Sequence, residues 1–111
     1  MSIVTDNNTC LLGGVHRTTQ TVAVGDSSVA SSAIAKGAVL RIVSTTNCHI
    51  NLGATAASNS AYLPANVVEF IGIGGSTTVN VIRNSADGTL FVTVIEPLPG
   101  FNISTAGSYG G

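Results

Sequence analysis

The side chains of this chain that could do chemistry are few and widely spaced. The two histidines are His16 and His49, and neither lies at a metal-ligand spacing from another histidine or a cysteine. Five side chains carry carboxylates, namely Asp6, Asp26, Glu69, Asp87 and Glu96. No two of them are close enough in sequence to suggest a local acid–base pair. We therefore predict no catalytic, cofactor-binding or metal-binding residues, and we expect a protein that is not an enzyme.

Two local features resemble functional motifs, and both have a simpler explanation. A Cys–His or Ser–His–Asp site would have to assemble in space from Cys48, His49 or a serine, since no Gly-x-Ser-x-Gly elbow marks a nucleophile. Residues 72–77 resemble a phosphate-binding loop, but they lack its lysine and precede an expected strand. We interpret them as a hairpin turn. Cys10 and Cys48 are interpreted as two buried thiols, with a disulfide between them as the alternative.

Charge is sparse throughout the sequence. Charged residues make up 8% of the 111 residues and hydrophobic residues 44%, so a core can form although little charge covers it. The basic residues are scattered and form no patch for nucleic acid. No apolar run approaches the roughly 20 residues of a membrane span, and we expect no membrane association. The N-terminal residues lack the features of a signal peptide, so we expect a protein made in a cytoplasm.

Short alternating segments rich in Val, Ile and Thr predict strands, and no segment shows sustained helical periodicity. The expected strands cover residues 19–24, 27–35, 38–45, 48–53, 67–73, 76–83 and 88–97, with Leu40 and Ile42 on one face of the third. We expect a bend at residues 62–66 and a hairpin loop at residues 84–88, which carries the turn signal Asp87-Gly88. Six to eight short strands at this spacing predict an all-β fold, either a small antiparallel, jelly-roll-like β-sandwich or a barrel. We expect one β domain over residues 19–97, flanked by an N-terminal arm (1–18) and a Gly/Ser-rich C-terminal arm (98–111).

Several expected strands are apolar on both faces. In residues 90–96, Leu90 and Val92 can line a core, yet the opposite row contains Phe91 and Ile95. A lone sandwich would expose such a row, and monomers seldom expose large apolar patches. Covering about 600 Å² of it would yield roughly 15 kcal/mol before association costs. We therefore expect a homo-oligomer, a dimer or trimer; the alternative is that arms of the same chain cover these residues.

The expected interface has two parts. The arms are expected to order on a neighbouring subunit, the alternative for the tail being a disordered segment. Subunit-facing strand residues are expected to cover each other. The residues assigned to the arms are Leu11, Leu12, Phe101 and Tyr109, and those assigned to the strands are Ile82, Phe91 and Ile95.

Residues 38–97 resemble the small all-β structural proteins of tailed bacteriophage virions. In that type, a "vlRIvs" strand leads to a "vrvnlG" strand, a polar loop, "yLPanvveyi", a Gly-containing turn, a "vnVir" strand and a "GtlyVT" strand. The matching positions here are residues 41–43, 50–53, 62–65, 67–70, 79–82 and 88–93. The first 18 residues and the Gly-rich tail have no counterpart in this pattern.

The resemblance implies a capsid decoration or cement protein that binds and stabilises the head shell. Its expected partners are the major capsid protein or other virion proteins, and its expected location is the virion, after synthesis in the host cytoplasm. The alternative is a tail or head-fibre component, or a carbohydrate-binding β module, whose site would need exposed aromatic residues. Tyr62 and Tyr109 are the only tyrosines, and tryptophan is absent.

Overall fold

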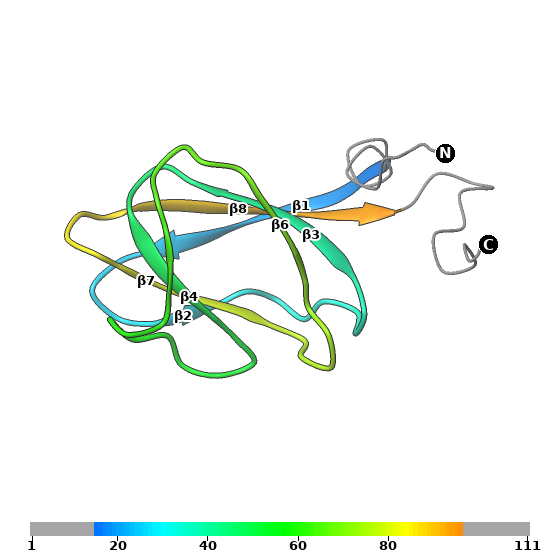
Figure 1. The fold of residues 1–111 in the computed structure, drawn as a ribbon, viewed down its shortest axis with the longest axis horizontal. Coiled ribbons are helices and arrows are strands. Elements are labelled where there is room, and N and C mark those ends of the chain that lie inside the picture. Colours follow the sequence, from blue (N-terminus) through cyan, green and yellow to red (C-terminus); the bar gives the residue numbers. More distant parts are fainter. Residues whose placement is uncertain (1–14, 97–111) are drawn as a thin grey trace.

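The computed structural model describes residues 15–96, which form two antiparallel four-stranded sheets and no helix. The strands are β1 (Val15–Val24), β2 (Val29–Ala30), β3 (Val39–Ser44), β4 (Cys48–Leu52), β5 (Ala61–Leu63), β6 (Glu69–Gly72), β7 (Val79–Arg83) and β8 (Gly88–Glu96). The first sheet has the order β1-β8-β3-β6 and the second sheet the order β2-β7-β4-β5. Figure 1 shows the two sheets stacked face to face. The predicted β-sandwich is confirmed.

The strand order is that of an eight-stranded jelly roll. β1 pairs with β8, β2 with β7, β3 with β6 and β4 with β5, so the chain folds as one long hairpin wrapped around the core. Val15 pairs with Glu96, which places both ends of the described chain at the same end of the sandwich (Figure 1). The sheets are separate, so the fold is a jelly-roll sandwich and not a closed barrel.

Alternation along each strand builds the core between the sheets. In β3, Leu40 and Ile42 are fully buried, whereas Val39, Arg41 and Val43 are only half-buried on the outer face, as the sequence predicts. The other large, completely buried side chains come from both sheets and their connections: Leu63, Ile73, Val79, Val81, Leu90 and Val92. Burying one such side chain contributes about 1.5–3 kcal/mol, so these residues dominate the stability of the fold.

One side of the sandwich is closed by polar side chains. The Ser32 amide donates a 2.8 Å hydrogen bond to the Gln20 side chain, linking β1 to the segment after β2. The Val79 amide donates to Ser31 Oγ at 2.9 Å, which extends the pairing of β2 with β7. The edges of the two sheets are therefore joined at β1 and β2. On the opposite side, the edges are β5 and β6.

Three local predictions differ from the structure. β1 begins at Val15, so Val15 to Thr18 belong to the sheet and not to an arm. Tyr62 and Leu63 belong to β5, and the predicted bend starts only at Pro64, which cannot donate to a ladder. The turns at residues 72–77 and 84–88 do not close hairpins, because β6 and β7, and likewise β7 and β8, lie in different sheets. Gly74 does adopt a positive φ of 60° in the first of these turns.

Gly88 allows two turns to pack closely. A Cβ atom at Gly88 would lie 2.6 Å from Thr45 Oγ1 and from Thr46 Cγ2. The Thr89 amide donates to the same Thr45 hydroxyl at 2.9 Å, so this threonine cannot move freely. We expect Gly88→Ala to lower the free energy of unfolding by about 1–3 kcal/mol, measured by urea denaturation. Gly75→Ala is the control, because a Cβ atom at Gly75 would have no other atom within 4 Å. Equally small losses of unfolding free energy for the two variants would contradict the close packing at Gly88.

Cys48 is a buried, free thiol on the inner face of β4. Cys10, its partner in the disulfide alternative, lies outside the described residues. Burial raises the pKa of the Cys48 thiol, and a hydrogen bond with Ser44 lowers it in part. A protonated, inaccessible thiol reacts slowly. In a Cys10→Ser variant we expect Ellman's reagent to label Cys48 only after unfolding in guanidinium chloride; fast labelling of the native protein would contradict this placement.

Candidate interaction surface

The outer face of the first sheet carries two phenylalanine side chains, Phe70 and Phe91, that point away from the core. Its residues follow from the register of β3 with its neighbours. Val43 lies opposite Phe91 of β8, and Arg41 lies between Thr93 of β8 and Phe70 of β6. Val39 lies between Ile95 and Gly72. We call this surface, formed by Val39, Arg41, Val43, Phe70, Phe91, Thr93 and Ile95, the apolar face.

Exposure is uneven across the apolar face. Phe91 is 37% exposed and lies at one end, and the exposed Val67 and Val68 directly precede β6. Val39, Val43 and Phe70 are half-buried. Ile95, predicted to face a neighbouring subunit, is only 4% exposed and so presents almost no surface. Its cross-strand neighbours are His16 and Val39, and it lies at the far end of the face from Phe91.

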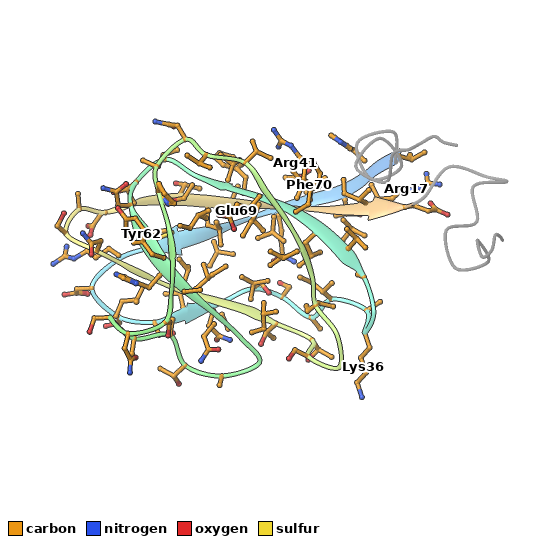
Figure 2. The ribbon with its side chains drawn as sticks, in the orientation of Figure 1. Arg17, Lys36, Arg41, Tyr62, Glu69 and Phe70 are labelled. Atoms are coloured by element: carbon orange, nitrogen blue, oxygen red, sulfur yellow. The ribbon has the colours of Figure 1, made fainter. Side chains whose placement is uncertain are left out.

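Arg41 is the one charged residue at the centre of the apolar face. Figure 2 shows Arg41 and Phe70 on the outer side of the first sheet, directed away from the second. Within residues 15–96, the ion pairs join Arg17 to Glu96 and Arg83 to Asp87, and neither includes Arg41. A half-buried guanidinium amid apolar side chains is suited to a planar, bidentate contact with a carboxylate on another molecule.

The central position of Arg41 restricts which surface can cover this face. A twofold axis through its centre would bring the Arg41 side chains of two copies together, and opposed like charges disfavour such a pair. A surface that differs from the apolar face avoids this repulsion. The geometry therefore fits a heterologous contact, as between neighbouring copies in a ring of three or with a second protein.

Ile82 lies on the other side of the molecule. It is half-buried on the outer face of the second sheet, opposite His49. The His49 ring lies 5.4 Å from the ring of Tyr62, at an interplanar angle of 56°. The structure therefore does not bring Ile82 together with Phe91, and the two residues cannot belong to one continuous patch.

Cys48 and His49 do not form a catalytic pair. They point to opposite faces of β4, since Cys48 belongs to the core and His49 to the outer side. His49 Nδ1 lies 3.1 Å from the Ser60 carbonyl oxygen, and Nε2 lies 3.1 Å from Asn84 Oδ1. Both ring nitrogens are thus occupied by contacts that fix the neighbouring loops. In residues 15–96 no group of three potential metal-ligating side chains occurs.

Sequence reasoning found only part of the apolar face. It identified Phe91 but missed Phe70 of β6 and both Arg41 and Val43 of β3. The alternation of residues 39–43 does place Arg41 and Val43 on the outer side. The four arm assignments, Leu11, Leu12, Phe101 and Tyr109, lie outside the described residues.

The described part of the chain contains no helix long and apolar enough to cross a membrane. Comparisons of the chain with protein families, with curated proteins and with solved structures find no match.

Proposed function

We propose that this chain is a non-enzymatic structural protein of a tailed-bacteriophage particle, a capsid decoration protein that binds and stabilises the head shell. The observation that carries the proposal is the apolar face, an outer sheet surface with an exposed Phe91 and a central Arg41 that has no ion pair within residues 15–96. A protein that leaves such a surface exposed tends to aggregate, unless another protein covers the surface. The resemblance of residues 38–97 to small virion proteins is the reason for proposing a phage particle as the assembly.

The fold and the amino-acid composition also support a structural protein. Eight-stranded jelly rolls are frequent among viral capsid and lectin domains, although this analogy indicates architecture and not activity. Only 8% of the residues are charged, whereas Ser, Thr and Asn are abundant. These uncharged groups can hydrogen-bond to a neighbouring protein without the high desolvation cost of buried charges.

The proposed assembly is a ring of three copies bound to the major capsid protein, because a twofold contact through the apolar face would bring two Arg41 side chains together. The apolar face meets a carboxylate-bearing surface of its neighbour, with Phe91 as the apolar anchor and Arg41 as the ionic one. The arms, residues 1–14 and 97–111, are attached at one end of the sandwich because Val15 pairs with Glu96. Both arms can therefore grip the same region of a shell.

Particle labelling tests this function. Antibodies against the chain, viewed by electron microscopy on purified particles of the phage that encodes it, should decorate the head in many copies. A chain lacking residues 1–14 or 97–111 should keep its β-sheet circular dichroism spectrum but lose binding to heads that lack the protein. Absence from the particle would overturn the proposal, and unchanged binding by both truncations would overturn the role of the arms.

A second candidate function, carbohydrate binding, is favoured by one observation. Tyr62 is 48% exposed on the outer face of the second sheet, and its ring is tilted against that of His49, which contacts the Asn84 side chain. Exposed aromatic rings next to polar groups suit the apolar face of a sugar ring. Glycan-array binding by the purified chain that is lost in Tyr62→Ala would support this candidate, and no binding to any glycan would exclude it.

A further inference from the structure

An open groove of about 360 Å³ lies between the two sheets at the side where β5 and β6 form their edges. The residues that line it are Ile50, Asn51, Leu52, Ala61, Glu69 and Ile71. The opposite side of the sandwich is closed by Gln20 and its hydrogen bond to Ser32. The groove therefore exposes part of the interior of the sandwich at this edge.

The lining combines an apolar floor with one carboxylate. Ile50, Leu52 and Ile71 pack with the core, and Leu52 and Ile71 are only half-buried. The Asn51 amide is engaged, since its Nδ2 donates a 3.1 Å hydrogen bond to the Thr55 carbonyl oxygen. Glu69 is exposed, and among residues 15–96 no basic side chain pairs with it. Among the described residues that line the groove, Glu69 is the only one with a charge.

We propose that this groove binds a primary alkylammonium group, which in the assembled particle is the side chain of a lysine on a neighbouring protein. A lysine carries a four-carbon apolar stem below a compact cation. The stem would lie on Ile50, Leu52 and Ile71, and the ammonium would pair with Glu69. An anion would be repelled by Glu69, and a neutral chain would leave the carboxylate without a partner.

The chain does not supply this lysine itself. Its one lysine is Lys36, in the connection between β2 and β3. Figure 2 shows Lys36 at the lower edge of the molecule, well separated from Glu69. The cation must therefore come from a partner. The identification of the partner as a virion protein rests on the proposed function, whereas the binding of an alkylammonium does not.

The experiment is a titration of the full chain, labelled with ¹³C at its methyl groups, with n-butylammonium chloride, the analogue of a lysine side chain. The methyl resonances of Ile50, Leu52 and Ile71 should shift and saturate. The isosteric 1-butanol should bind at least about threefold more weakly, the range of an exposed ion pair. Tetramethylammonium, which has the charge but no stem, should leave these resonances in place.

Two variants separate the ion pair from general effects. Glu69→Gln should abolish the preference for butylammonium over butanol, while its spectrum otherwise matches that of the wild type. Asp26→Asn, which removes an exposed carboxylate outside the groove, should retain the preference. Absence of saturable shifts, or a preference unchanged in Glu69→Gln, would overturn the proposal. Either failure would leave head labelling unaffected, so it is distinguishable from failure of the proposed function.

Discussion

Phe91→Ser is expected to convert the assembled protein into single copies while leaving each copy folded. Phe91 is the most exposed aromatic residue of the apolar face and has Val43 and Thr21 as its cross-strand neighbours. Its ring points outward, so its removal opens no cavity in the core. Truncating an aromatic anchor that an interface buries typically costs about 2 kcal/mol or more, a roughly 30-fold rise in Kd. Sedimentation equilibrium over a concentration series measures this change.

Val29→Ser is the matched control for this substitution. Val29 is also 37% exposed, but it lies on β2 at the edge of the second sheet, away from the apolar face. Its replacement should leave the dissociation constant within about twofold of the wild-type value. If Phe91→Ser and Val29→Ser weaken association equally, or if neither does, the apolar face is not the interface.

Leu40→Ala is expected to cause the largest loss of stability of any single substitution described here. Leu40 is completely buried in β3, with Ile71 and Val94 as its cross-strand neighbours. Removing a buried leucine side chain leaves a cavity and costs about 2–5 kcal/mol. This is a large part of the roughly 5–15 kcal/mol that stabilises a typical domain. The melting temperature should fall by roughly 10 °C or more.

Val39→Ala tests whether burial causes the effect of Leu40→Ala. Val39 neighbours Leu40 in β3 but lies half-buried on the outer face. Its replacement should cost less than about 1 kcal/mol of unfolding free energy in urea denaturation. Comparable losses for the two variants would mean that the inner and outer faces of β3 have been assigned incorrectly.

Alternation predicted the faces of the strands well, because it depends only on neighbouring residues. Leu40 and Ile42 were assigned to one side of β3, and both are fully buried. The connections were predicted less well. Residues 84–88 contain the turn signal Asp87-Gly88, yet they cross between sheets. The same turn chemistry serves a hairpin and a sheet crossing, so local sequence does not distinguish them.

β5 was missed for a related reason. The residues that precede it, 54–60, carry no large side chain, and the strand has only three residues. Its extended conformation depends on pairing with β4, where Leu63 lies opposite Cys48. A pairing of this kind is a property of the folded sheet and leaves little trace in a three-residue segment.

The apolar face illustrates what sequence reasoning could not supply. Phe91 was identified from its own strand, but Phe70 and Arg41 join it only because β6, β3 and β8 are neighbours in the first sheet. Ile95 was assigned to the correct face, yet alternation does not reveal how much of a face is already covered. Ile82 was assigned to the same interface as Phe91, although β7 belongs to the other sheet.

The central claim is that another protein copy covers the apolar face, and the mass of the full chain in solution tests it most directly. Multi-angle light scattering of the purified protein at micromolar concentration should give about three times the chain mass of 11.1 kDa. A single species of 11.1 kDa that persists as the concentration is raised would contradict the account.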